Sequence, residues 1–167
     1  MEKQIRVGII TLSDRASKGE REDLSGKILK EMIVDLNWKV ECYKVLPDEK
    51  DMLMALLKEW VDEKKLDLIL TNGGTGVHPR DITPEATLAI IQKEIPGIPE
   101  YIRYISYPIT PMSALTRGVA GVRGETLIIN LPGSPKAIKE IFPKLVKIIV
   151  HAIEKIQGDP HECARPD

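Results

Sequence analysis

A short apolar run that ends in a cluster of glycines constrains the fold of this chain more than any other feature. Residues 66–71 are rich in β-strand formers, and residues 72–76 read Asn-Gly-Gly-Thr-Gly. A helix start follows at residues 80–87, where Thr83 can serve as N-cap and Pro84 suits the first helical position. A strand, a glycine loop and a helix N-terminus together present backbone N–H groups to an anion. The segment therefore predicts a phosphate-binding turn.

Two familiar phosphate motifs are absent from this turn. No lysine follows Gly76, so the turn is not the loop of P-loop NTPases, and its glycines lack the GxGxxG spacing of dinucleotide-binding turns. A simpler reading is a tight strand-to-helix turn, in which Gly-Gly only lets the chain reverse direction. Because three glycines, two threonines and an Arg-Asp pair crowd into residues 71–81, we favour ligand binding.

Composition and charge exclude several other classes of protein. The 167 residues, 43% of them hydrophobic, suit one domain; we expect residues 1–158 to form it and residues 159–167 to form a flexible tail. A net charge of −1 provides no basic field, so we expect neither nucleic acid nor a membrane as a partner. Cys42 and Cys163 are predicted to be free thiols. No apolar run is long enough to span a bilayer and no signal-peptide pattern opens the chain, so we expect a cytoplasmic protein.

Strand and helix patterns alternate along the chain. Apolar runs predict strands at residues 5–11, 40–46, 66–71 and 126–131. Helical spacing predicts helices at about 22–36, 47–61, 84–94, 99–106, 111–117 and 135–156. Ser134 is the expected N-cap of the last helix. Because strand–helix–strand crossovers favour parallel pairing, the sequence predicts an α/β fold: a three-layer α/β/α, Rossmann-like domain with a mostly parallel central sheet.

The polar loops of this domain are expected to meet at one place. In parallel α/β sheets, ligands bind at the carboxyl ends of the strands. Here those ends are followed by residues 13–14, 47–48, 73–81 and 132–136. This convergence supports the binding reading of the glycine turn.

Four segments, taken in order, resemble one family. Residues 11–17, 71–76, 80–87 and 130–136 are similar to motifs of the MogA-type molybdopterin adenylyltransferases, whose domain also occurs in plant and animal molybdenum-cofactor proteins. The resemblance runs from the first predicted strand to the last helix. It implies a trimeric α/β enzyme that uses ATP and Mg²⁺ to adenylylate molybdopterin in molybdenum-cofactor biosynthesis. It also implies contact with the enzyme that inserts molybdenum.

The implied reaction joins two polyanions. The terminal phosphate of molybdopterin attacks the α-phosphorus of ATP and expels pyrophosphate, so catalysis consists mainly of positioning and charge neutralisation. No covalent protein nucleophile is required. Mg²⁺ typically binds one or two carboxylates together with substrate phosphates and waters, so Asp48 and Asp81 would suffice. The resemblance implies that these two aspartates are the catalytic residues.

Both aspartates also have structural readings. Asp48 stands where the N-cap of an amphipathic helix is expected, and on the residues alone capping is the favoured reading. At Asp81 the cap role is already filled by Thr83, so neither reading is favoured there. The resemblance favours a functional role for both residues.

The resemblance implies a wider set of nucleotide- and substrate-binding residues, namely Ser13, Asp14, Gly73, Gly74, Thr75, Gly76, Arg80, Ser106, Thr116, Gly133, Ser134 and Lys136. Ser106 and Thr116 match hydroxyl positions around the pterin, although serine is more usual at the second, and structural helix positions explain them equally well. Arg80 and Lys136 offer cations for phosphate, but Lys136 also fits a solvated first turn. His78 is a poor metal candidate because no second His or Cys lies at ligand spacing.

Three other functional readings remain open. The chain could be a non-catalytic, scaffolding relative that binds molybdopterin, although the two aspartates and the full glycine loop argue against that reading. It could be another nucleotide-dependent pyrophosphatase on the same domain, of the competence-damage type, although those chains usually carry a second domain. A paralogue of the MoaB type is the third reading.

The implied trimer requires an apolar contact surface. Residues 98–121 have no obvious covering layer, and the surface is expected from Ile98, Tyr101, Ile102, Tyr104, Ile105 and Tyr107.

Overall fold

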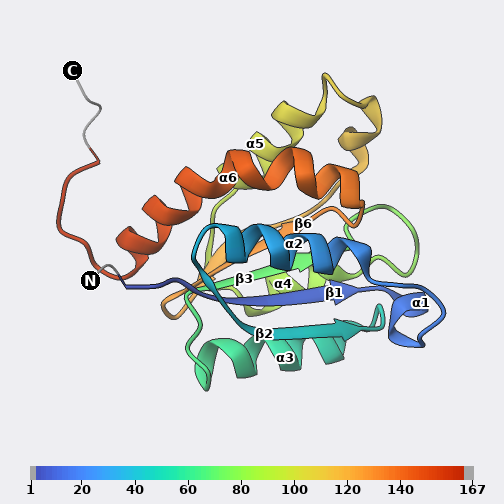
Figure 1. Ribbon diagram of the computed structural model, residues 1–167, viewed down its shortest axis with the longest axis horizontal. Coiled ribbons are helices and arrows are strands. Elements are labelled where there is room, and N and C mark those ends of the chain that lie inside the picture. Colours follow the sequence, from blue (N-terminus) through green and yellow to red (C-terminus); the bar gives the residue numbers. More distant parts are fainter. Residues whose placement is uncertain (1–2, 164–167) are drawn as a thin grey trace.

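A central sheet runs through the middle of the molecule (Figure 1). The computed structural model describes residues 3–163, and within them six strands pair in the order β2-β1-β3-β6-β5-β4. The strands are β1 Arg6–Leu12, β2 Lys39–Leu46, β3 Leu68–Asn72, β4 Lys93–Glu94, β5 Ala120–Arg123 and β6 Thr126–Leu131. Neighbours among β2, β1, β3 and β6 are parallel, whereas β5 runs antiparallel to β6 and β4 antiparallel to β5. The predicted α/β fold with a mostly parallel sheet is confirmed.

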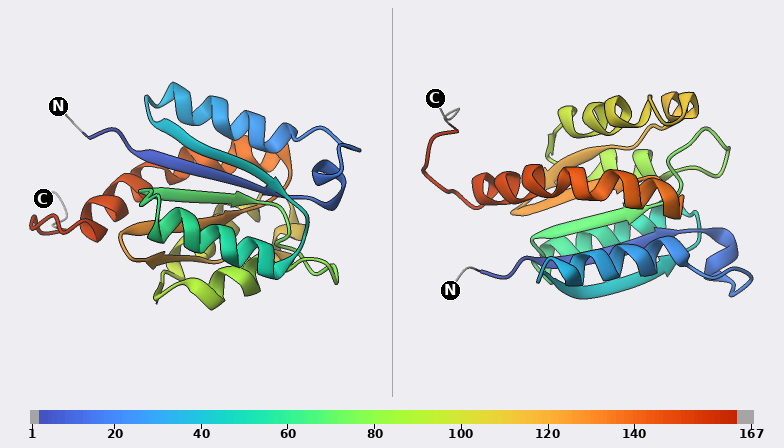
Figure 2. Two further views of the ribbon diagram at one scale, coloured as in Figure 1. Left: turned by 90° about the horizontal axis from the view of Figure 1, so that it is seen from below. Right: turned by 45° about the horizontal axis from the view of Figure 1, so that its top comes forward.

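Helices cover both faces of the sheet (Figure 2). They are α1 Asp14–Ser17, α2 Leu24–Asp35, α3 Lys50–Asp62, α4 Thr83–Ile90, α5 Gly97–Ser106, the 3₁₀ helix η1 Pro111–Leu115 and α6 Pro135–Ile156. Side chains of α2, α5 and α6 pack on one face, and those of α3 and α4 pack on the other. The three layers are therefore helix, sheet and helix.

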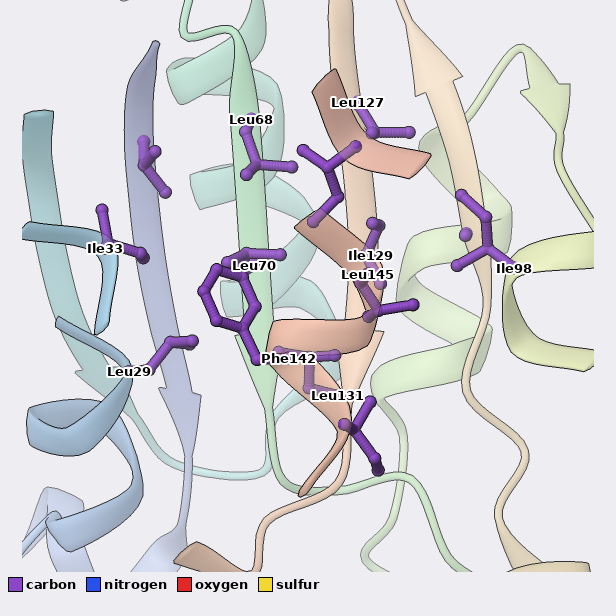
Figure 3. Close-up of a cluster of buried hydrophobic side chains, with 14 of the residues drawn as sticks. Leu29, Ile33, Leu68, Leu70, Ile98, Leu127, Ile129, Leu131, Phe142 and Leu145 are labelled. Atoms are coloured by element: carbon purple, nitrogen blue, oxygen red, sulfur yellow. The ribbon is translucent and has the colours of Figure 1, made fainter. Parts of the chain in front are cut away.

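Alternation along the strands gives each face its own core. Leu68 and Leu70 of β3 are buried with side chains of α2 and α6, while Ile69 between them packs with α3 and α4. Figure 3 shows the first of these cores, with Phe142 of α6 among the side chains of β3 and β6. Each fully buried side chain of this size stabilises the fold by about 1.5–3 kcal/mol.

The segment after α4 departs from the sequence prediction. The pattern predicts a helix over residues 84–94, yet α4 ends at Ile90 and Lys93–Glu94 forms strand β4. The backbone N–H groups of Gln92 and Ile95 both donate to carbonyls of β5 at 2.8 Å. The helix prediction is wrong at this end because pairing with β5, a strand that the local pattern does not reveal, outweighs helix propensity.

Other element boundaries shift by a few residues. α2 begins at Leu24 and α3 at Lys50, and only residues 111–115 of the helix predicted at 111–117 are helical, as the short helix η1. The N-cap prediction for α6 is confirmed, since Ser134 Oγ accepts a hydrogen bond from the N–H of Ala137 at 3.4 Å.

The apolar side chains of α5 do not form one exposed face. The expected contact surface includes Ile98 and Ile102, but both point into the core and are only 3% and 4% exposed. Their spacing places them on the sheet side of an amphipathic helix. Tyr104 and Tyr107 are exposed. The expected surface is therefore wrong for the two isoleucines, which the fold needs for its own core.

Three further predictions concern membrane-spanning helices, the two cysteines and the C-terminal tail. Within residues 3–163, no helix is long and apolar enough to cross a membrane. Cys42 and Cys163 are free thiols, as predicted. The expected flexible tail, residues 159–167, extends outside the described residues from position 164 onward, and its flexibility stays a prediction.

Candidate functional site

The carboxyl ends of the parallel strands bring the sequence-predicted segments together at one edge of the sheet. The N–H of Ser13, after β1, donates to Leu46 O at the end of β2 at 2.9 Å. The N–H of Gly73, after β3, donates to Leu131 O at the end of β6 at 3.2 Å. Gly133 packs on Gly73 so closely that an added Cβ would lie 3.1 Å from the Gly73 Cα. Four loops therefore meet here, at the edge where parallel sheets bind ligands.

The glycine turn after β3 needs glycine for its own conformation. Gly73 and Gly74 have φ angles of +92° and +66°, which L side chains rarely adopt. A Cβ on Gly73 would lie 2.4 Å from Leu12 O, and one on Gly74 would lie 2.4 Å from Thr83 Oγ1. A tight turn alone accounts for these two glycines, so the case for phosphate binding depends on the groups around them.

Thr83 joins this turn to α4 and does not cap the helix. The N-cap position is Ile82, and Thr83 is the first helical residue. Its Oγ1 donates to Gly73 O at 2.9 Å, and its N–H donates to Gly74 O at 3.2 Å. The N-cap prediction is wrong because the hydroxyl binds a carbonyl of the preceding turn instead of a free helix N–H.

Asp14 and Asp48 bind each other's backbone across two loops. The N–H of Asp14 donates to Asp48 Oδ2 at 3.1 Å, and the N–H of Asp48 donates to Asp14 Oδ1 at 3.0 Å. The N-cap of α3 is Glu49, which makes no side-chain cap bond. The capping reading of Asp48, favoured on the residues alone, is therefore wrong.

The second carboxylate oxygen of Asp48 is buried without a partner. Within the described residues, Oδ1 receives no hydrogen bond, and it lies 3.0 Å from the position of a Cβ on Gly74. Burial raises the pKa of Asp48, and repulsion from Asp14 and Asp81 adds to the rise, against the hydrogen bond from the Asp14 backbone. An unpaired buried oxygen of an acid costs stability and is a suitable cation ligand.

Arg80 reaches across the edge of the sheet to two carboxylates. Its Nε and Nη2 donate to the two carboxylate oxygens of Asp14 at 2.9 and 3.0 Å, and Nη2 also donates to Glu49 Oε1 at 2.8 Å. The bonds from Arg80 hold the pKa of Asp14 below its usual range. The side chain of Arg80 is 47% exposed, so a phosphate can reach it from solvent.

Asp81 and His78 organise the loop between the turn and α4. Asp81 Oδ2 accepts a hydrogen bond from the N–H of His78 at 3.0 Å, and a Cβ on Gly76 would lie 2.9 Å from the same oxygen. His78 Nδ1 accepts from the N–H of Arg80 at 3.1 Å. His78 therefore serves the backbone of its own loop.

Two hollows flank the glycine turn. The first has a volume of about 330 Å³, and its lining includes Ser13, Asn72, Gly73, Gly133 and Ser134. The second has about 270 Å³ and mostly apolar walls between α5, η1 and α6, and its lining includes Thr75, Gly76, Ser106 and Thr116. A further hollow of about 380 Å³ lies at the amino ends of the strands, away from these loops.

Three further predicted site residues, Ser106, Thr116 and Lys136, lie in different surroundings. Ser106 Oγ donates to Ile102 O in its own helix at 2.6 Å, and Thr116 Oγ1 donates to Thr75 Oγ1 at 3.4 Å. Both residues line the second hollow. Lys136 is exposed in the first turn of α6 and lines neither hollow. The structure therefore joins Ser106 and Thr116 to the glycine turn and leaves Lys136 outside.

Two residues at this edge were not singled out from the sequence. Asn72 is fully buried; its Nδ2 donates to Thr11 Oγ1 at 2.9 Å, while Oδ1 receives no hydrogen bond within the described residues. Arg117 donates from its guanidinium to the carbonyl oxygens of Gly76 and Asp81. No local pattern could have revealed these contacts, since the partners lie 36 to 61 residues away along the chain.

The fold and this edge define an α/β domain with a glycine turn, three aspartates and an arginine at the carboxyl ends of its strands. Residues 8–152 match the model of the MoCF_biosynth family, which is described as a probable molybdopterin binding domain. The chain belongs to this family.

Similar proteins agree with that assignment. The molybdopterin adenylyltransferase of Helicobacter pylori is 43% identical over 157 residues, which cover 93% of this chain and 89% of that protein. The molybdenum cofactor synthesis protein cinnamon of Drosophila melanogaster is 41% identical over 158 residues, which cover 94% of this chain and 26% of that longer protein. The crystal structure of the molybdopterin biosynthesis enzyme MoaB from Thermus thermophilus matches with a TM-score of 0.87 and 46% identity, over 95% of this chain and 100% of that one. The resemblance to this family is confirmed.

Proposed function

We propose that this chain is a molybdopterin adenylyltransferase. An oxygen of the molybdopterin phosphate forms a bond to the α-phosphorus of ATP, and the bond from that phosphorus to the pyrophosphate oxygen breaks. The products are adenylyl-molybdopterin and pyrophosphate. The observation that carries the proposal is the buried, unpaired Asp48 Oδ1 beside the glycine turn, in a chain whose relatives of similar length are named for this activity.

Mg²⁺ fits the acidic side of this edge. Asp48 offers a buried oxygen without a donor, and Asp81 lies near enough to raise the pKa of Asp48. No cluster of three or more His, Cys, Asp or Glu side chains within residues 3–163 could hold a metal by itself. Mg²⁺ typically takes one or two carboxylates and completes its shell with phosphates and water, so Asp48 and Asp81 would need the substrate phosphates to complete the site. Bound there, the ion would neutralise phosphate charge.

The residues of the chain would bind and orient the two polyanions. We assign the ATP phosphates to the glycine turn and to Arg80, whose guanidinium is held in place by Asp14 and Glu49. Ser13, Gly133 and Ser134 line the adjoining hollow and are candidates for the nucleotide.

We assign the pterin to the second hollow. Its apolar walls suit a flat ring, and the hydroxyls of Ser106 and Thr116 supply polar groups at its edge. Lys136 is exposed outside both hollows, so we assign it to the solvated first turn of α6.

We also propose a homotrimer. Exposed apolar side chains gather on α5, η1 and the loop between them, namely Tyr104, Tyr107, Ile109, Met112 and Leu115. The cytoplasmic location is expected from the sequence pattern and the contact with the molybdenum-insertion enzyme from the resemblance, and both stay predictions.

Pyrophosphate release tests the proposed reaction. We expect the purified protein to release pyrophosphate only when ATP, Mg²⁺ and molybdopterin are all present. Release without molybdopterin would indicate a nucleotide pyrophosphatase instead. Molybdopterin binding without any release would indicate a non-catalytic relative.

A further inference from the structure

Arg117 closes the loop that carries Arg80 and Asp81. Its Nε donates to Gly76 O at 2.7 Å, and its Nη2 donates to Asp81 O at 3.1 Å. Its own N–H donates to Thr75 O at 2.8 Å. One arginine therefore binds the chain on both sides of residues 77–80.

The same guanidinium is tied to helix α4. Its Nη1 binds the carboxylate of Glu85 in the first turn of that helix. The three nitrogens thus point at three separate acceptors, which the rigid, planar fork of arginine can satisfy together. A lysine ammonium on a flexible stem has no comparable geometry.

Apart from Arg117, the loop is held by hydrogen bonds among its own residues and by the surface side chain of Arg80, which binds Asp14 and Glu49. Residues 77–80 are all exposed, and the side chain of Arg80 is itself half-exposed to solvent. Asp81 is bound within the loop through the His78 N–H. Without Arg117, the distance between Gly76 and Asp81 would be set mainly by contacts that solvent can replace.

We infer that Arg117 is a positioning residue for adenylyl transfer, which fixes the Asp81 carboxylate against the glycine turn by binding the carbonyls of Gly76 and Asp81. This inference rests on the proposed function. Arg117 acts through the backbone of the loop and needs no contact with either substrate. Displacement of a reacting group by about 1 Å can cost ~100-fold in rate, so a loosened loop should lower turnover more than it weakens substrate binding.

Arg123 provides a matched control at the other end of α4. Its Nη1 donates to Ile90 O at 2.9 Å, and its Nε and Nη2 bind the Asp62 carboxylate at 3.1 and 2.9 Å. It therefore combines a backbone carbonyl and a carboxylate as Arg117 does, at the edge of the molecule away from the site. Arg117→Lys and Arg123→Lys should lose similar stability.

The experiment compares kinetics with loop protection in the two variants. We expect Arg117→Lys to lower kcat by about 10- to 100-fold with a smaller change in the KM for ATP, while Arg123→Lys keeps the wild-type kcat. Without substrates, the hydrogen-bonded amide protons of His78, Arg80 and Asp81 should exchange faster in Arg117→Lys than in the wild type. If Arg117→Lys does not fold, Arg117→Gln replaces it, because the amide nitrogen of glutamine can still donate to a loop carbonyl.

The two readouts separate failure of this inference from failure of the proposed function. If the wild-type protein releases no pyrophosphate, the proposed function is wrong. The exchange measurement then still tests whether Arg117 holds the loop in place. Unchanged exchange in Arg117→Lys, or equal losses of kcat in the two lysine variants, would overturn the positioning role.

Discussion

Among single residues, Asp48 most strongly indicates a bound ligand. A buried aspartate that serves structure satisfies both oxygens, as Asp67 does at the opposite edge of the sheet, where the two carboxylate oxygens accept three hydrogen bonds. Asp48 satisfies only Oδ2, through the N–H of Asp14. The difference between these two aspartates favours a ligand as the missing partner of Asp48.

Asp48→Ser tests this reading directly. We expect the variant to stay folded and to lose pyrophosphate release, because the hydroxyl supplies neither the charge nor the reach of the carboxylate. Asp51→Ser, in the exposed first turn of α3, is the control and should remain active. Pyrophosphate release and a melting curve for each variant are the measurements. An active Asp48→Ser protein would leave Asp81 as the only acidic candidate.

Asp48→Asn should make the protein more stable at neutral pH. The pKa of Asp48 is raised in the folded state, mainly by burial, so the folded protein binds this proton more tightly than the unfolded chain does. Its contribution to stability is present at low pH and is lost as pH rises from the usual carboxyl pKa, about 3.9, through the raised value.

Melting curves measured across a range of pH test the direction of this change in stability. The Tm of Asp48→Asn should exceed that of the wild type at pH 7, and the difference should shrink as pH falls through the raised pKa of Asp48 towards about 4. Asp14→Asn provides the opposite case, because Arg80 holds the pKa of Asp14 low. An Asp48→Asn protein that melts below the wild type at pH 7 would contradict the account of an unpaired, repelled carboxylate.

Between β3 and α4, the side chain and the backbone of Thr83 both bind the glycine turn. Thr83 is fully buried, and its Oγ1 binds the carbonyl of Gly73 inside the turn. The turn conformation and the direction of α4 are therefore fixed together, and a capping interaction would fix only the helix.

Substitutions at Thr83 distinguish these two roles. We expect Thr83→Val to cost about 1–3 kcal/mol of unfolding free energy, because the carbonyl of Gly73 loses its buried donor. Thr83→Ser keeps the hydroxyl and should cost less. Thr83→Asp should be strongly destabilising, although aspartate is among the best N-cap residues. Denaturant titration measures all three, and a stable Thr83→Asp protein would restore the capping role.

At the scale of the whole molecule, the exposed apolar residues lie beside the second hollow. Met112 and Leu115 of η1 are 65% and 51% exposed and also line that hollow. A subunit contact on this surface would therefore adjoin the proposed pterin site.

A charge on this surface should break the proposed trimer. We expect light scattering at micromolar concentration to give the mass of three chains for the wild type and a lower mass for Met112→Glu. Val34→Glu is the matched control, because Val34 is 56% exposed on α2, away from η1. A monomeric wild type would contradict the proposal, and equal masses for wild type and Met112→Glu would place the interface elsewhere.

The sequence by itself determined the fold class, most of the helices and strands, and the family. Apolar periodicity located the four parallel strands and α6, and turn chemistry located the glycine turn, because these signals depend on neighbours a few residues apart. The order of strands and helices placed the four polar loops at one edge. The family followed from the motifs in those loops, as the match over residues 8–152 confirms.

Only the tertiary structure decided which groups touch. Asp14 and Asp48 are 34 residues apart in the chain, Arg80 and Asp14 are 66 apart, and Arg117 and Gly76 are 41 apart. The short strands β4 and β5, the role of Thr83 and the unpaired oxygen of Asp48 also depend on partners from distant segments. Local propensity cannot encode such contacts, because their energies arise only when the packed sheet brings the loops together.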